Sequence, residues 1–170
     1  MGSMAQARLQ RAQSRLLQLT GKNENQRVSV TGAIFTRDTS NPKLGEAYRD
    51  PSGLIWGSVV KTSQGATKHM NEYDAKRYCE SIGARLPTKV EFEQLARYLG
   101  QGTAEGYDPY LADGKTEILP GLADRWFWSA SVVSYNRSFA WYFYGGFSHY
   151  VGYNDFYRNF HSIAVRCVDR

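Results

Sequence analysis

Residues 75–88 read Ala-Lys-Arg-Tyr-Cys-Glu-Ser-Ile-Gly-Ala-Arg-Leu-Pro-Thr, and Glu91-Phe92 follows three residues later. Pro87 lacks a backbone N–H and clashes inside a helix, so it separates two helices. Gly83 is suited to end the first helix, and the Thr88 hydroxyl is suited to cap the second. Glu91 falls at the third position of that second helix, where it completes a capping box. The segment therefore predicts a helix, a break and another helix.

The flanking segments predict short strands and long loops around this pair of helices. Upstream, Arg27–Phe35 and Leu54–Val60 read as strands, and Asn71 is suited to cap a first helix over Glu72–Ile82. Downstream, residues 100–120 form a loop rich in Gly, Asp and Pro, and the rest of the chain reads as short strands and loops. We therefore expect an α+β fold with two helices packed on small antiparallel sheets and long irregular loops.

The length and the charge of the chain limit the classes of protein to which it can belong. Its 170 residues suit one ordinary domain with its own core. The net charge of +5 is unevenly spread, because residues 1–27 contribute +4 and the rest only +1. A nucleic-acid-binding domain carries its basic residues on the folded part, so nucleic acid is not an expected partner. No run of 18 apolar residues occurs, so this segment is not expected to insert into a membrane.

Residues 1–24 are expected to lie outside the domain, which we place at residues 25–170. The opening Met1-Gly2-Ser3-Met4 looks like an expression scar before a second methionine, so the lack of a signal peptide carries little weight. A helix is predicted over residues 4–20, where apolar residues repeat every three or four positions at Ala5, Leu9, Ala12, Leu16 and Leu19. This helix is a tether or, with barely two heptads, a short oligomerising element.

The two cysteines, Cys79 and Cys167, are either two buried thiols or one disulfide. Two cysteines cannot form a four-ligand zinc site unaided, and no histidine lies near either at zinc-finger spacing. The three histidines also lack metal-ligand spacing. We therefore expect no metal and no cofactor.

Three segments, in this order, resemble bacterial C-type-lectin-like domains. They are the helix–Gly–Arg-Leu-Pro-Thr–helix element, Trp126-Phe127-Trp128-Ser129-Ala130-Ser131 and Ala164-Val165-Arg166-Cys167-Val168. Similar runs occur in the formylglycine-generating and sulfatase-modifying families and in a family of bacterial surface domains, and the resemblance covers residues 47–170. It implies a fold in which the first helix packs beside the terminal strand, so that Cys79 and Cys167 would pair. A disulfide in turn favours export, because cytosolic disulfides are uncommon.

The C-terminal third is unusually aromatic, since residues 126–160 hold 15 of the 24 aromatic residues. Tyr142, Phe143 and Tyr144 are consecutive, and neighbours on a strand point to opposite faces, so some rings must face outward. One interpretation is a Tyr-rich sheet packed by cross-strand aromatic pairs. The other is a recognition surface, because binding loops favour Tyr, Ser, Gly, Asn and Arg.

Residues 129–163 contain no Lys, Glu, Gln or Met, although the other 135 residues contain 26 of them. Every residue type present there except Trp141 can be reached from an Asn codon by changing its adenines. This pattern resembles the footprint of diversity-generating retroelements, whose variable proteins are C-type-lectin-like and carry the variable stretch at the C-terminus. The resemblance implies a displayed ligand-binding protein with residues 129–163 as its candidate variable region. A β-rich segment naturally poor in long charged side chains is the alternative.

The retroelement interpretation divides the aromatic third into scaffold and ligand contacts. The expected scaffold residues are Trp128, Ala140, Trp141, Ile163 and Val165. The candidate ligand contacts are Tyr135, Asn136, Tyr142, Tyr144, His149, Tyr150, Tyr153, Asn154, Asp155, Tyr157, Arg158, Asn159 and His161. The expected partner is a protein or a glycan, met at a cell surface or on a phage.

Enzymatic activity is not expected. The formylglycine-generating enzymes use a redox-active cysteine pair beyond their structural cysteines, whereas both cysteines here match the helix and terminal-strand positions. Asn154-Asp155 is preceded by Tyr153, not by the Trp of calcium-binding lectins, and no nucleophile elbow or phosphate loop occurs. Two other functions stay open: a fixed-specificity bacterial adhesin or carbohydrate-binding domain, and a non-catalytic relative of the formylglycine-generating enzymes.

Overall fold

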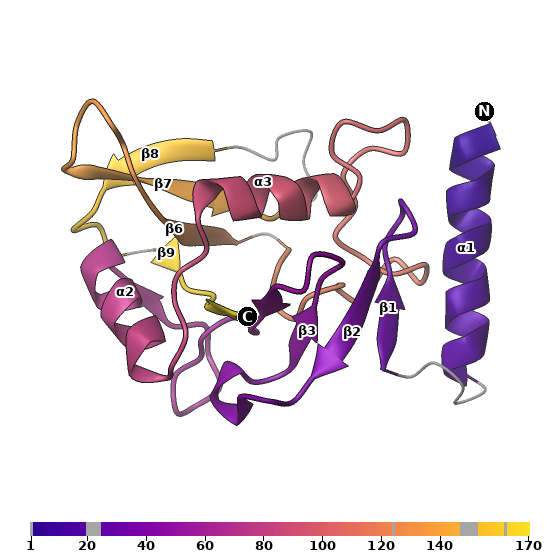
Figure 1. The fold of residues 1–170 in the computed structure, drawn as a ribbon, viewed down its shortest axis with the longest axis horizontal. Helices are drawn as coiled ribbons and strands as arrows, with labels where there is room; N and C mark the ends of the chain where they lie inside the picture. Colours follow the sequence, from indigo (N-terminus) through magenta and orange to yellow (C-terminus); the bar gives the residue numbers. More distant parts are fainter. Residues whose placement is uncertain (1, 20–24, 124, 147–152, 162) are drawn as a thin grey trace.

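A computed structural model describes residues 2–19, 25–123, 125–146, 153–161 and 163–170 (Figure 1). Within these ranges the protein has three α-helices and two five-stranded sheets, which confirms the expected α+β class. None of the described helices combines the length and the apolar content needed to cross a bilayer.

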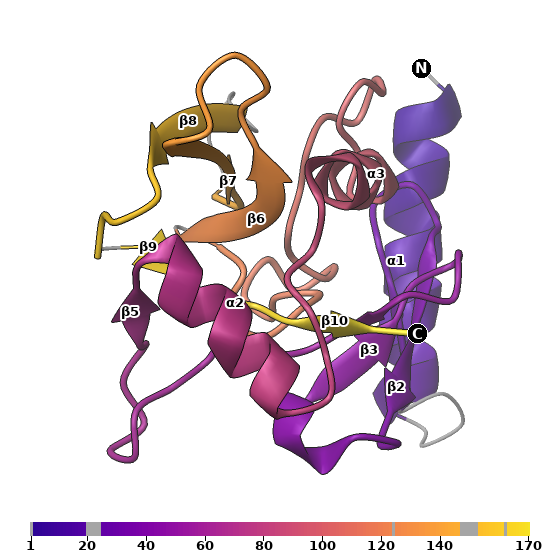
Figure 2. The ribbon, with the colours of Figure 1, turned by 60° about the vertical axis from the view of Figure 1, so that its left-hand side comes forward.

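The first sheet brings the end of the chain back to its beginning. Its strands lie in the order β1-β2-β3-β4-β10, and every neighbouring pair is antiparallel. The strands are β1 (Gln26–Val28), β2 (Ile34–Asp38), β3 (Ala47–Arg49), β4 (Ile55–Trp56) and β10 (Val168–Asp169). Figure 2 shows β10 passing from the side of α2 toward β3.

The second sheet carries the aromatic third of the chain. Its strands lie in the order β5-β9-β6-β7-β8, with β6 and β9 parallel at one position and the other pairs antiparallel. The strands are β5 (His69–Met70), β6 (Trp126–Val132), β7 (Phe139–Tyr144), β8 (Tyr153–Tyr157) and β9 (Ile163–Ala164).

Two predicted strands differ from the structure. The segment Arg27–Phe35 is a hairpin and not one strand, because Ser29 N–H donates to the Ala33 carbonyl (2.9 Å) and Gly32 turns the chain with φ +85°. The segment Leu54–Val60 is a strand only at β4. Beyond it the amides of Gly57, Ser58 and Val59 donate to the carbonyls of three separate segments, at Cys167, Leu44 and Pro120 in turn. Val59 and Val60 are buried as a strand would be, but no single strand pairs with the segment after β4.

The two helices that flank Pro87 form as predicted, from local chemistry. Helix α2 (Glu72–Ser81) begins where the Asn71 side chain accepts from Asp74 N–H at 2.8 Å, and Gly83 follows its end with φ +77°. Helix α3 (Lys89–Tyr98) begins with the predicted capping box. In it the Thr88 hydroxyl accepts from Glu91 N–H at 3.1 Å, and the Glu91 carboxylate accepts from Thr88 N–H at 2.8 Å.

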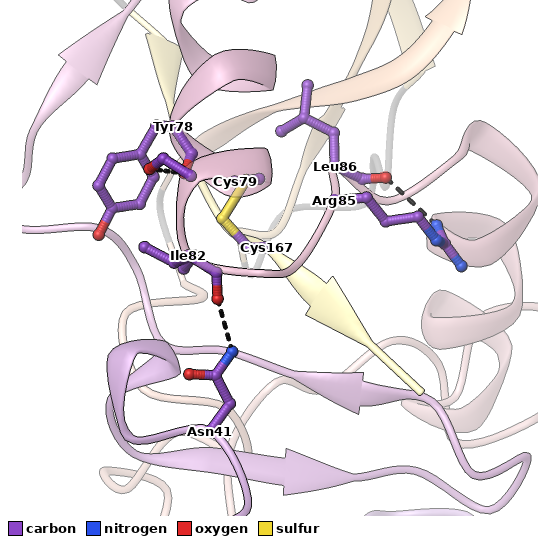
Figure 3. Close-up of a disulfide and its surroundings, with 8 residues drawn as sticks. Asn41, Tyr78, Cys79, Ile82, Arg85, Leu86 and Cys167 are labelled. Atoms are coloured by element: carbon purple, nitrogen blue, oxygen red, sulfur yellow. Dashed lines mark hydrogen bonds between the residues drawn. A yellow bond between two sulfur atoms is a disulfide. The ribbon is translucent and has the colours of Figure 1, made fainter.

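The predicted disulfide between Cys79 and Cys167 is confirmed (Figure 3). Both cysteines are buried, and they join α2 to the residue before β10. Beside them, Arg85 and Val168 exchange two backbone hydrogen bonds of 3.0 and 2.8 Å. The helix–break–helix element is therefore tied to the C-terminus both covalently and by hydrogen bonds.

Helix α1 (Gly2–Leu19) lies beside β1 (Figure 1), and the described members of its apolar repeat, Ala5, Leu9 and Ala12, are exposed. Its buried contact is Ala7, and Arg11 donates to Asp108 at 2.6 Å. Among the side chains of this helix that the structure describes, those of Ala7 and Arg11 therefore contact the domain, through a small residue and an ion pair.

The core lies between α3 and the two sheets, with a second cluster around α2 and the disulfide. Phe92 of α3 stacks on Phe143 of β7, with ring centroids 4.7 Å apart, and also contacts Trp56 at 5.4 Å. A fully buried arginine, Arg166, donates to the carbonyls of Gly57 and Pro120. Burial lowers its pKa to about 9, so the guanidinium stays charged at neutral pH and ties the long loop to the core.

Candidate ligand-binding surface

Both faces of the middle of the β6–β7 hairpin are covered. Phe127 and Phe143 pair across the hairpin and belong to the core cluster that contains α3. Trp128 and Tyr142 also pair across it, and they belong to the cluster around α2 and β9. Because successive residues on a strand alternate between faces, consecutive aromatics can all be buried in a sheet covered on both sides. These four aromatic residues are therefore not available to a ligand.

Most of the expected scaffold residues are buried. Trp128, Ala140, Ile163 and Val165 are nearly or fully inaccessible, and Trp128 Nε1–H donates to the Met70 carbonyl at 2.8 Å. Trp141 differs from the expectation. It is only half-buried, and the Lys89 ammonium lies 4.2 Å from the centroid of its ring.

Tyr142, a candidate ligand contact, does not face outward, which corrects the prediction. Only 9% of it is accessible, because it lies opposite Trp128 on β6 and under the ring of Trp126 at 5.0 Å. Its neighbour Tyr144 is half-exposed and packs on Trp126 at 4.4 Å. A side chain at Gly146 would collide with the Tyr144 ring, so the position of this ring depends on that glycine.

The most exposed candidates gather at one end of the second sheet, at the left of Figure 1. The β6–β7 turn and the end of β8 are held together there, since Arg158 N–H donates to the Ser138 carbonyl at 3.0 Å. The rings of Phe139 and Tyr157 also lie 4.4 Å apart. Tyr135 is 77% exposed and Tyr157 is 56% exposed. The exposed candidates Asn136, Asn159 and His161 belong to the same two segments.

Arg158 holds these segments to α2, which differs from its expected role as an open ligand contact. Its Nε donates to the Glu72 carboxylate at 2.9 Å, and Glu72 N–H donates to the Arg158 carbonyl at 2.8 Å. The guanidinium also donates to the Arg137 carbonyl at 3.3 Å and lies 4.3 Å from the centroid of the Tyr73 ring. Because Glu72 is buried, its charge needs this partner.

The structure adds three exposed aromatic residues that the sequence did not single out: Tyr73, Trp126 and Phe160. Tyr73 is brought to the site by Arg158, and no sequence pattern links residues so far apart. Phe160 directly follows the candidate contact Asn159, so only its orientation was missed. Trp126 lies two residues before the buried Trp128, at the opposite end of the hairpin from the β6–β7 turn.

We use "tail–turn surface" for Tyr73, Tyr135, Asn136, Tyr157, Arg158, Asn159, Phe160 and His161. Trp126 and Tyr144 form a separate aromatic pair, because they face each other at the first residue of β6 and the last of β7. At about 3.3 Å per residue, the six-residue strand β7 separates the two groups by about 15–17 Å. The predicted contacts therefore do not form one continuous patch among the described residues.

Several candidates lie outside the described residues. His149 and Tyr150 belong to this group. Tyr153, Asn154 and Asp155 are described only through their backbone, which pairs with Phe143, Tyr142 and Trp141 of β7.

In the parts of the chain that the structure describes, no three His, Cys, Asp or Glu side chains gather as a metal site requires. The polar groups of the tail–turn surface are instead amide, hydroxyl, imidazole and guanidinium groups beside aromatic rings, which suits hydrogen bonding and stacking with a ligand. In comparisons with known proteins, neither a family model nor a curated protein matches this sequence.

Proposed function

We propose that this protein is a non-catalytic ligand-binding domain with a C-type-lectin-like fold, exported and displayed, whose C-terminal surface is diversified by a retroelement. The observation that carries the proposal is the distribution of exposed aromatic residues. Five aromatic residues are exposed among the described ones, and four of them, Tyr73, Tyr135, Tyr157 and Phe160, belong to the tail–turn surface. Exposed aromatic rings close to one another are characteristic of binding sites.

The way in which this surface is built also favours recognition. Its residues come from helix α2, a turn, a strand end and the segment after that strand, all anchored on a disulfide-linked core. Tyr offers a large contact area at little entropic cost, and Asn and His add hydrogen-bonding groups. A rigid scaffold that carries exposed residues of this kind can accept changes in them, because they contribute little to its stability.

The fold proposal draws support from three features together. The helix before Arg-Leu-Pro-Thr is joined by a disulfide to the end of the chain, the last strand β10 completes the first sheet, and the Trp-rich segment opens the β6–β7 hairpin. The first of these is what the resemblance to C-type-lectin-like domains implies, and the other two involve the remaining segments that carry the resemblance.

A library experiment tests whether the surface tolerates diversity. Codons for Tyr135, Tyr157 and Asn159 would be randomised at their first two bases in a displayed library, and a matched library would randomise Ala140, Tyr142 and Ile163. We expect most clones of the first library and few of the second to resist protease, because only the second set is buried. If the first library survived as poorly as the second, the exposed residues would be structural, and the surface would not tolerate diversity.

A genomic comparison tests the diversification itself. A retroelement predicts a near-identical template repeat close to the gene, differing from codons 129–163 only at adenines of the template, and a reverse-transcriptase gene beside it. Differences spread over all four bases would refute the retroelement and leave only the binding function.

A second candidate function, a fixed-specificity carbohydrate-binding domain, is favoured by Trp126. This residue precedes the candidate variable region, is 44% exposed and packs against Tyr144. An exposed indole presents a flat apolar face on which a sugar ring can stack. A glycan array would support this function if the wild type bound particular glycans and the Trp126→Ala variant did not.

A further inference from the structure

A groove that shares no residue with the tail–turn surface lies where α2 ends, beside the disulfide. Its volume is about 250 Å³, and it is lined by the short 3-10 helix Pro42–Leu44, the segment after β4, the end of α2 and one cysteine. The lining residues that matter are Lys43, Leu44, Ser58, Val60, Lys61, Tyr78 and Ile82. Figure 3 shows Tyr78 and Ile82 beside the disulfide, with Asn41 below them.

Five of the backbone carbonyls that line this groove already accept a hydrogen bond. The Ile82 carbonyl accepts from Asn41 Nδ2 at 2.8 Å, and the Tyr78 carbonyl accepts from the Ser81 hydroxyl at 2.6 Å. The carbonyls of Leu44, Val60 and Cys167 each accept a backbone N–H at 2.9 Å. The groove therefore offers a ligand few acceptors.

Hydrogen-bond donors and positive charge, by contrast, remain available in the groove. The ammonium groups of Lys43 and Lys61 and the hydroxyl of Tyr78 have no hydrogen-bond or ion-pair partner among the described residues, and no carboxylate lines the groove. Apolar walls from Leu44, Val60 and Ile82 accompany these charges. The site thus combines two cations with an apolar interior, and its walls are held in place by the disulfide and by the hydrogen bonds above.

We propose that this groove binds a small organic anion, with a carboxylate between Lys43 and Lys61 and an aliphatic body against Leu44, Val60 and Ile82. The groove is smaller than the usual site of a drug-sized molecule, so the ligand is a short-chain acid or a terminus of similar size. The proposal does not depend on the tail–turn surface, because none of the residues is shared.

The experiment uses hexanoate as the probe, with hexylamine, hexanol and acetate for comparison. Titrations of the ¹⁵N-labelled full chain should give saturable amide shifts at Gly45, Ser58 and Lys61 with hexanoate. We expect dissociation constants at least about tenfold weaker for each of the other three probes. Equal binding of hexylamine or hexanol would overturn the anion preference, equal binding of acetate would overturn the apolar half, and the absence of saturable shifts would overturn the site.

Matched variants separate a built site from general charge attraction. K43Q/K61Q removes the two groove ammoniums, whereas K76Q/K115Q removes the same charge from two exposed positions outside the groove lining. We expect the first variant to lose hexanoate binding at least about tenfold and the second to keep it within about twofold. An equal loss in both variants would mean that the shifts report only net charge, and would refute the site.

Discussion

Replacing Arg158 with Met tests whether position 158 belongs to the scaffold or to the ligand face. In the structure its guanidinium donates to both Glu72 oxygens, at 2.9 and 3.4 Å. The side chain of Glu72 is 2% exposed and that of Arg158 is 17% exposed. Removing the cation would leave a buried carboxylate without its partner, while the methionine would keep most of the apolar stem.

The expected cost follows from this burial. Breaking a buried ion pair by removing one partner costs about 3–5 kcal/mol, and the low end applies because Arg158 reaches solvent. For a chain of this length, about 3 kcal/mol corresponds to a fall in the melting temperature of about 6–12 °C. In the double variant E72Q/R158M no uncompensated charge remains, so the loss should be smaller than in R158M alone.

Urea unfolding followed by circular dichroism would measure these differences in the free energy of unfolding. The matched control is Arg77→Met, which breaks an exposed ion pair between Arg77 and Asp74 on α2, the helix that also contains Glu72. Those two side chains are 73% and 53% exposed, so the change should cost at most about 0.5 kcal/mol. If R158M lowered the free energy of unfolding as little as R77M, the Arg158–Glu72 ion pair would be unimportant for stability, and position 158 would be free to act as a ligand contact.

Three further predictions concern the rest of the fold. Removing the disulfide with C79A/C167A should lower the free energy of unfolding by about 4–5 kcal/mol, since the bond closes a loop over a sequence separation of 88. Intact mass with and without reductant checks the bond itself, and two freely alkylating thiols in native, oxidised protein would disprove it. Glu91→Gln should destabilise the domain at neutral pH. Burial raises the pKa of Glu91, but the hydrogen bonds that its carboxylate accepts from Arg85 and Thr88 outweigh this effect, so its pKa in the folded protein lies below the ordinary 4.5. The carboxylate therefore stabilises above that pH, and the gap between variant and wild type should close as the pH falls through the folded pKa; a gap that is constant with pH would refute this. A truncated chain starting at Asn25 should keep its melting temperature within a few degrees, whereas a loss of about 3 kcal/mol would place α1 in the core.

Local features of the fold were predictable from the sequence. Pro87 with Thr88 and Glu91, and Asn71 before α2, form caps from groups a few residues apart, so the order of residues suffices to place them. The pairing of Cys79 with Cys167 was predictable only through the resemblance to a known family. The α+β class followed from the same local signals.

Which aromatic residues face solvent was decided by tertiary structure alone. Alternation along β7 places Trp141 and Tyr142 on opposite faces, but it does not say which face is covered. Here the cluster around α2 and β9 includes Tyr142 and buries it, whereas the core cluster on the α3 side includes Phe143 but not Trp141, which stays half-exposed. In the same way, Arg158 became a clamp because the fold brings it to Glu72, 86 residues away. Contacts over such separations depend on how the elements pack, and no local pattern in the chain encodes them.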